Sequence, residues 1–254
     1  CPWAKYRKNK GGIKMHTLVD LRGNLPVSVY LTSASVNDVK ALDDLYIEPS
    51  AIYLMDRGYV DFNRLFKLIT KKNAFFVTRA KDNMLFEVVS EAEVDKSTGI
   101  ISDERIKLTG LHTAKWYPEE LRMVTYEDYA TSKVYRFLTN NMEYEALTIS
   151  ELYRERWNVE LYFKWIKQHL HIKSFYGTSE NAIYLQIWIA ICTYLLLAYA
   201  KKVMHIDQSL HTISKNVGLF LTDKTPLNEL FNKAVPTEET EDWLYPSLFR
   251  PDDF

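Results

Sequence analysis

The chain has 254 residues, of which 47% are hydrophobic, 14% aromatic and 26% charged. This composition excludes intrinsic disorder, a collagen-like repeat and a long coiled coil, and the length suits one large domain or two small ones. The net charge of −1 gives no general attraction for nucleic acid, so binding would depend on local clusters of charge. Two cysteines, Cys1 and Cys192, exclude a disulfide framework and fit a reducing cytosol. No signal or transit peptide is recognisable, and the missing initiator Met suggests a fragment.

The first third of the chain predicts alternating strands and short helices. A basic run precedes them, with the five cations Lys5, Arg7, Lys8, Lys10 and Lys14 and no acid. The expected elements are a β-hairpin over 13–20 and 26–32, a helix over 35–46 capped by Ser35 or Asn37, a buried strand over 51–56, a helix capped by Asp61, and a buried strand over 74–80.

The rest of the chain changes character twice. Residues 84–140 offer several strand-like runs separated by polar turns, which predicts a β-rich insert. After Asn141 the pattern is helical. Expected here are one helix over 145–170, a second from Thr178 or Ser179 to about 204, a third over 208–217, and a solvated acidic tail over 237–254.

One segment is long enough to raise the question of a membrane. Residues 183–200 carry no charge over 18 positions, close to the roughly 20 residues that span a bilayer. The polar Gln186 and Thr193 interrupt the segment, and Lys201 and Lys202 follow it directly. We therefore favour a buried core helix, apolar nearly all round, over a membrane span.

The stretch 151–171, most of which belongs to the predicted helix over 145–170, carries an unusual set of side chains. At about 100° per residue, one arc of about 100° collects an acid, three bases and two aromatic residues. These residues are Tyr153, Arg156, Trp157, Glu160, Lys164 and Lys167. A solvated face with an i,i+4 ion pair between Glu160 and Lys164 is the plain alternative. A carboxylate ringed by cations also suits a metal ligand beside a phosphate backbone, and the aromatic residues suit stacking on a base.

The spacing within this helix resembles a known signature. Tyr153-x2-Arg156-x3-Glu160-x6-Lys167 is similar to the Tyr-x2-Arg-x3-Glu-x6-Lys pattern of the insertion-sequence DDE transposases of family four. Asp56-Arg57-Gly58-Tyr59 resembles the segment that carries the second catalytic Asp of that family. The runs PWAKYRKNKGGIKMHTLVD, FFVTRAK and FLTNN are similar to further family segments, so the resemblance covers about residues 2–205.

The resemblance implies a function and a site. It implies that Asp56 and Glu160 are catalytic metal ligands and that Tyr153, Arg156 and Lys167 hold phosphates at the transposon end. The helical spacing predicts that Trp157 and Lys164 also bind DNA. Arg79 is predicted to bind DNA because it lies at the end of a predicted strand. Mg²⁺, with Mn²⁺ as a substitute, is the expected cofactor, because two divalent ions held by converging carboxylates can activate the nucleophile and stabilise the leaving oxygen.

The resemblance also implies the wider setting of the protein. The fold class is α/β, because the order of elements is similar to a ribonuclease-H-like domain if one strand preceded residue 1. The expected domains are residues 1–82 and 145–218 for the core, 83–144 for the β-rich insert, and 219–254 for the tail. Double-stranded DNA, both transposon ends and target, and a homodimer on that DNA are the expected partners, in the cytoplasm at the nucleoid and without a membrane.

The first acid of the family's triad has no counterpart in the printed sequence. It sits about a dozen residues before the Pro2-Trp3-Ala4-Lys5 stretch, so the chain as given is expected to have little or no activity. A truncated or repurposed DNA-binding remnant is the main alternative, and a nuclease that cuts without strand transfer is a weaker one. The six histidines and two cysteines show no zinc spacing, and nucleophile-elbow, P-loop and dinucleotide motifs are missing.

Overall fold

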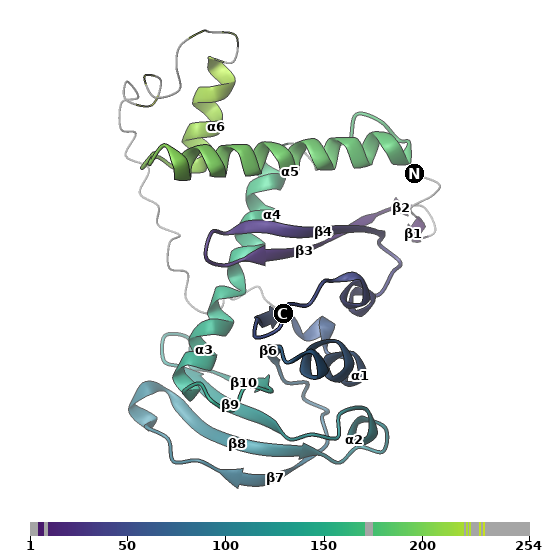
Figure 1. The fold of residues 1–254 in the computed structure, drawn as a ribbon, viewed down its shortest axis with the longest axis vertical. Helices are drawn as coiled ribbons and strands as arrows, with labels where there is room; N and C mark the ends of the chain where they lie inside the picture. The colour runs from purple at the N-terminus through teal and green to yellow at the C-terminus, as the bar shows by residue number, and fades with distance from the viewer. Residues whose placement is uncertain are drawn as a thin grey trace. The chain divides into compact units, whose positions relative to one another are not determined.

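The computed structural model describes residues 5–7, 10–170 and 175–220, together with Thr222, Lys224, Glu229 and Phe231. The predicted acidic tail, Lys8 and His171 lie outside these residues. Two compact units make up the described part of the chain (Figure 1). The first contains the described residues of Cys1–Ser35 and Asn158–Asp242, and the second contains Val36–Trp157. Each unit has a hydrophobic core of its own.

The first unit combines short strands with long helices. Its elements are β1 Lys5–Arg7, β2 Lys10–Gly11, β3 Ile13–Asp20, β4 Leu25–Ser33, α4 Trp157–His169 from its second residue, α5 Glu180–Val203 and α6 Leu210–Leu219. The predicted hairpin is confirmed, since β3 and β4 pair antiparallel over their whole length. Inside the hairpin, His16 Nε2 lies 3.0 Å from Thr32 Oγ1, and this contact satisfies two buried polar groups.

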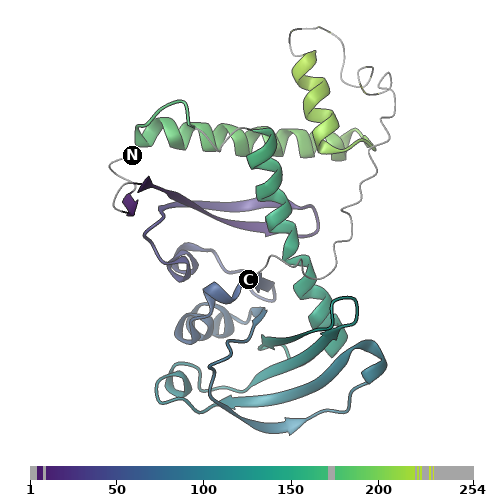
Figure 2. The same cartoon turned by 180° about the vertical axis from the view of Figure 1, so that it is seen from behind.

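Helix α5 begins as the sequence predicts. The side chain of Ser179 accepts a hydrogen bond from the backbone N–H of Ala182, so Ser179 rather than Thr178 is the cap. Ile183, Ile187 and Ile191 pack onto apolar residues of the β3–β4 hairpin. Further along, Tyr194 joins the core formed with α4 and donates from its hydroxyl to the Asn24 carbonyl at 2.9 Å. Helix α5 therefore ties the hairpin to α4 (Figure 2).

The same helix is long and apolar enough to cross a bilayer by length and composition alone. Only 33% of its most apolar window is buried inside the structure. The prediction of a buried core helix is thus confirmed for one face only, although the helix is apolar nearly all round as predicted. The opposite face presents large apolar side chains to the outside, including Leu196 and Tyr199.

The second unit is built on one six-stranded sheet. Its elements are η1 Asp38–Asp44, β5 Ile52–Met55, η2 Arg57–Tyr59, α1 Phe62–Arg64, η3 Leu65–Ile69, η4 Thr70–Lys72, β6 Phe75–Arg79, β7 Phe86–Glu91, η5 Lys96–Thr98, β8 Ile100–Leu108, α2 Thr113–Trp116, β9 Leu121–Asp128, β10 Lys133–Thr139 and α3 Ala146–Glu155. The strand order is β5-β6-β10-β9-β8-β7. Only β5 and β6 are parallel, so the unit is a mixed α/β structure with a mostly antiparallel sheet.

The predicted β-rich insert shares this sheet with the two buried strands before it. All four strand-like runs form strands, and β10 pairs with β6 through contacts such as Leu138 with Thr78. Helix α3 packs on the sheet, where Ile149 and Tyr153 join a core with Val77 and Phe137. The parallel strands and the insert are therefore held together by backbone pairing, which no local sequence pattern reveals.

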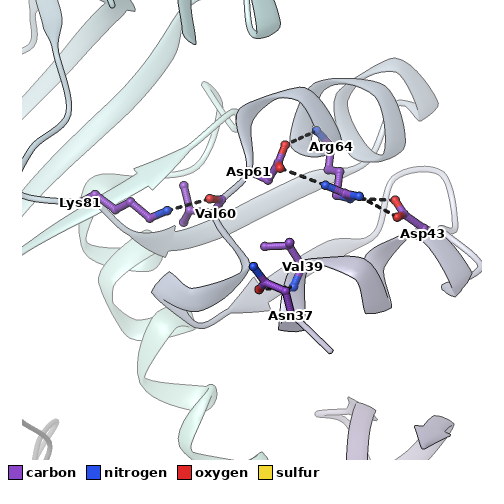
Figure 3. Close-up of polar contacts among 7 residues, drawn as sticks. All are labelled: Asn37, Val39, Asp43, Val60, Asp61, Arg64 and Lys81. Atoms are coloured by element: carbon purple, nitrogen blue, oxygen red, sulfur yellow. Dashed lines mark hydrogen bonds and ion pairs between the residues drawn. The ribbon is translucent and has the colours of Figure 1, made fainter. Parts of the chain in front are cut away.

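The loop between β5 and β6 is held by a small polar network, drawn in Figure 3. Asp61 caps α1, as predicted, by accepting from the backbone N–H of Arg64 at 3.0 Å. The Arg64 guanidinium donates to both oxygens of Asp43, each at 2.9 Å, and this bond lowers the pKa of the Asp43 carboxyl. Lys81 donates to the Val60 carbonyl at 2.9 Å. The network ties the segment that follows Asp56 to η1 and to the end of β6.

The single helix predicted over 145–170 is wrong. Helix α3 ends at Glu155, Arg156 forms a turn, and α4 starts at Trp157. The backbone N–H of Arg156 bonds to the Tyr153 carbonyl, three residues back, which is a tighter turn than the α-helical spacing of four. The angular arithmetic of one straight helix therefore does not hold across Arg156, although it holds within α4.

Candidate functional site

Asp56 lies where a buried strand ends. Strand β5 stops at Met55, and the Asp56 side chain caps the next turn by accepting from the backbone N–H of Gly58 at 3.1 Å. This bond occupies one carboxylate oxygen and fixes the rotation of the side chain. The Asp56 side chain is 60% exposed. The sequence thus folds locally to present an oriented carboxylate at the edge of the sheet.

Arg156 faces this carboxylate. Its Nη1 lies 3.8 Å from the second oxygen of Asp56, although 100 residues separate the two in sequence. The Arg156 guanidinium also lies 5.6 Å from the centre of the Tyr153 ring, at cation–π distance. The Arg156 side chain is only 16% exposed, so its charge is held in place rather than free in solvent. Asp56, Arg156 and Tyr153 therefore form one cluster inside the second unit.

Tyr153 is buried, whereas the predicted polar face places it at the surface. Its ring packs 4.9 Å from that of Phe137, measured between centroids. Burial raises the pKa of its hydroxyl to about 12, against the opposing effect of the nearby Arg156 charge. The hydroxyl therefore keeps its proton at all physiological pH values and is suited to donating a hydrogen bond to a phosphate oxygen.

Tyr59 and Asp38 also belong to this cluster, although the sequence does not predict them as site residues. Burial raises the pKa of Tyr59 to about 12, and the negative charges of Asp38 and Asp56 add to the shift. Asp38 also approaches Gly58, whose added Cβ would lie 4.0 Å from its Oδ2. Tyr59 belongs to the Asp56-Arg57-Gly58-Tyr59 motif and could have been singled out there. Asp38 has no sequence signal, because η1 reaches the motif only through the fold.

The two raised tyrosine pKa values predict how stability depends on pH. The unfolded chain loses these phenolic protons near pH 10, whereas the folded chain keeps them to about pH 12. Between these pH values the folded state binds more protons, so the free energy of unfolding falls as pH rises. Ultraviolet titration of phenolate should show late-ionising tyrosines, and Tyr153→Phe should remove one of them. Ionisation of Tyr153 near pH 10 would contradict its buried position.

Arg79 lies near this cluster and is held by an aromatic ring. Its guanidinium lies 5.1 Å from the centre of the Tyr135 ring, and its charge acts on the Tyr153 hydroxyl. On neighbouring segments, Asp82 accepts hydrogen bonds from Arg57 at 3.3 Å and from Arg136 at 3.4 Å. Three arginines therefore lie at the same edge of the sheet as Asp56, a basic rim that the sequence predicts only in Arg79.

The other predicted residues lie on α4. Trp157, the first residue of α4, is half-buried and belongs to the second unit, whereas the residues after it belong to the first unit. Glu160, Lys164 and Lys167 line one shallow hollow of about 360 Å³ together with Phe163 and Gln168. Both lysines are exposed, and the Lys167 ammonium lies 5.9 Å from the centre of the Phe163 ring. Within α4 the predicted spacing therefore brings the acid and two bases together. The core face of α4 holds Tyr162, Trp165 and Ile166, which are buried.

The carboxylates of the site suit a hard divalent cation. Oxygen ligands are what Mg²⁺ prefers, and both Asp56 and Glu160 are accessible carboxylates. The described residues contain no group of three or more His, Cys, Asp or Glu that would hold a metal by itself. Asp56 belongs to the second unit and Glu160 to the first, so their convergence on one metal stays a prediction.

Comparisons with known proteins agree on a family. The transposase DDE domain family matches residues 2–196. A protein of Sinorhizobium fredii named as the transposase y4zB is 36% identical over 81% of this chain and 58% of its own length. A protein of Geobacillus stearothermophilus, named as a transposase for the insertion sequence element IS5377, is 29% identical over 89% of this chain and 60% of its own length. A protein of a Synechocystis species, named as a transposase for the element IS4SA, is 26% identical over 84% of this chain and 57% of its own length.

No solved structure matches the chain at a significant level. The chain spans about three fifths of the length of the curated relatives it matches. The family match covers well over half of the chain and includes Asp56 and the complete Tyr-Arg-Glu-Lys signature. The chain therefore belongs to the DDE transposases of bacterial insertion sequences.

Proposed function

We propose that this chain is the catalytic portion of a DNA transposase that cleaves the ends of its insertion sequence and joins them to target DNA. The observation that carries the proposal is the cluster of Asp56, Arg156 and Tyr153. Within one unit, two residues of the Tyr-Arg-Glu-Lys signature lie beside the acid of the Asp-Arg-Gly-Tyr motif. A carboxylate beside a fixed cation and a protonated hydroxyl is the combination that metal-dependent phosphodiester chemistry uses. A ribonuclease-H-like arrangement of the whole domain belongs to this proposal.

The residues of the cluster take distinct roles in this reaction. Asp56 and Glu160 hold Mg²⁺ or Mn²⁺, which when bound lowers the pKa of the attacking water or hydroxyl and stabilises the leaving oxygen. The Gly58 N–H keeps the Asp56 carboxylate turned outward. Arg156 and Tyr153 hold a phosphate of the transposon end, the first by charge and the second by its hydroxyl proton.

The lysines of α4 contact the DNA backbone. Lys164 and Lys167 are exposed at successive turns of the helix that carries Glu160, so both can reach phosphates next to the scissile bond. Trp157 and Arg79 contribute a stacking surface and a further cation. These contacts fix the position of the substrate on the protein without reading its sequence. The partner is double-stranded DNA bound by a homodimer, in the cytoplasm at the nucleoid.

DNA binding by the chain tests this assignment of the lysines. Lys164→Gln and Lys167→Gln should each weaken DNA binding about equally for all DNA sequences. Each should also make the negative slope of log K against log salt shallower by about 1. The matched control is Lys96→Gln, which removes one exposed charge from η5 in the second unit and should leave the slope unchanged. Equal slopes for the α4 variants and the unaltered chain would contradict the proposed contacts.

A second reading is favoured by one specific observation. Asp56 and Glu160 are proposed as the second and third acids of the family's triad, and the described residues contain no group of three or more His, Cys, Asp or Glu that could hold a metal ion. The polypeptide as given would then bind DNA through the signature cations but show little or no cleavage. A protein extended by the upstream segment of the Sinorhizobium relative distinguishes the two readings, since the catalytic one predicts metal-dependent cleavage in the extended protein.

A further inference from the structure

The exposed face of α5 carries a continuous apolar stripe. At about 100° per residue, its members occupy an arc of about 100° on the side opposite Ile187 and Tyr194 of the core face. We define the α5 stripe as Leu185, Trp188, Ile189, Cys192, Leu196, Tyr199 and Val203, all of which are exposed. Leu196 and Tyr199 are 68% and 65% exposed. Scattered single apolar residues are normal on a surface, but a contiguous row of seven is a mark of an interface.

The order of residues in the stripe is symmetrical about its middle. Leu185 and Trp188 precede Cys192 by seven and four residues, and Leu196 and Tyr199 follow it by four and seven. Two copies of α5 packed antiparallel with Cys192 at the twofold axis would place Leu185 opposite Tyr199 and Trp188 opposite Leu196. The same surface then meets itself, as a twofold interface requires.

The charged residues at the two ends of the helix lie outside the stripe. At about 100° per residue, Glu180 falls about 130° and Lys202 about 90° from the middle of the stripe, and both are exposed. The contact between two copies would therefore be apolar along its length.

The size of the stripe is adequate for a dimer. From the exposed fractions of its side chains, roughly 600–700 Å² of mostly apolar surface is available on each chain, close to the about 800 Å² per partner of a standard interface. The aromatic members, Trp188 and Tyr199, are of the kind that contribute most to binding energy. A second copy of this chain therefore matches the stripe in area and polarity.

We propose that the α5 stripe is the homodimer interface, with two α5 helices packed antiparallel about Cys192. This proposal names the surface for the homodimer of the proposed function. Its test uses no DNA and no metal, so a failure here is distinguishable from a failure of the DNA chemistry. A phospholipid bilayer is the competing occupant of such an apolar helix, and the experiment includes it as an outcome.

Sedimentation equilibrium of the chain measures the dimer directly. The unaltered chain should form dimers, and Leu196→Glu should weaken dimerisation tenfold or more, because it places a carboxylate against Trp188 of the other copy. The control Val27→Glu adds the same charge at an exposed apolar position of β4 and should have no effect. A chain that stays monomeric, or an unchanged dimer in Leu196→Glu, would overturn the proposal.

Thiol cross-linking tests the position of the axis. Helices that pack about 8–10 Å apart, with Cα atoms about 2.3 Å from each axis, would bring the two Cys192 Cα atoms to about 3.5–5.5 Å. A short bis-maleimide should therefore link the dimer through Cys192, and Cys192→Ser should abolish the link while Cys1→Ser keeps it. Cross-linking that does not need Cys192 would overturn the antiparallel arrangement. Flotation of the chain with phospholipid vesicles instead of dimerisation would assign the stripe to a membrane.

Discussion

Glu160→Gln, made in the chain extended with sequence from a curated relative, is expected to lower metal-dependent DNA cleavage on the order of 10³-fold, equivalent to about 4 kcal/mol of transition-state stabilisation. Glutamine has nearly the shape of glutamate but a neutral amide, so it cannot supply the anionic oxygen that a divalent ion needs. Glu160 is half-exposed and lies beside Lys164 in the hollow of α4, where glutamine has the space that glutamate occupies. The fold and the affinity for DNA should stay within about twofold.

The control for this loss is a carboxylate on the neighbouring helix. Glu151→Gln removes the same charge from an exposed position of α3 and should leave cleavage unchanged. Asp56→Asn should behave like Glu160→Gln, because the asparagine oxygen can still accept the hydrogen bond from Gly58 while the charge is lost. Full cleavage activity in either the Glu160 or the Asp56 variant would refute its role as a metal ligand.

Arg122→Ala is expected to lower the free energy of unfolding by about 3–5 kcal/mol, because it leaves the buried Asp103 carboxylate without its counter-ion. Both side chains are about 90% buried, and Arg122 donates to the two oxygens of Asp103 at 2.7 and 2.6 Å. The same guanidinium donates to the carbonyls of Asn141 and Tyr144. It therefore holds the loop that leads from β10 into α3, the helix that positions Tyr153.

Urea unfolding measures this effect, with the neighbouring strand as its control. Arg105 is paired with Arg122 across β8 and β9 but is exposed, so Arg105→Ala should change stability by no more than about 0.5 kcal/mol. Replacing both partners, as in Arg122→Met with Asp103→Leu, should cost less than Arg122→Ala, because no buried charge then remains alone. A change below about 1 kcal/mol in Arg122→Ala would contradict the structural role of the pair.

Local patterns in the sequence suffice for much of the fold. The two buried strands β5 and β6 are short apolar runs that end at Asp56 and Arg79, and both form where predicted. The caps at Asn37, Asp61 and Ser179 follow from side chains that accept bonds from backbone N–H groups two or three residues ahead. These features depend on neighbours in sequence, which is why sequence reasoning reaches them.

Features that depend on residues distant in sequence could not be predicted. The turn at Arg156 divides the predicted helix, and the sequence has no Gly or Pro there to mark it. Tyr153 is buried because the sheet supplies Phe137 as a partner, so its exposure could not be read from helix angles alone. Asp38 reaches the motif through tertiary folding, and Asp103 with Arg122 forms an ion pair across two strands. For the site, the sequence predicts the residues, and the fold shows which of them share a unit.

Cleavage of the insertion sequence's own end DNA in the presence of Mg²⁺ is the most direct test of the account. The assay compares the 254-residue chain with the protein extended by the upstream segment of a curated relative. The catalytic assignment predicts cleavage and transfer of the labelled end to target DNA in the extended protein, and loss of both in its Glu160→Gln variant. Salt-sensitive DNA binding without cleavage in the extended protein would contradict the catalytic assignment and leave a DNA-binding remnant.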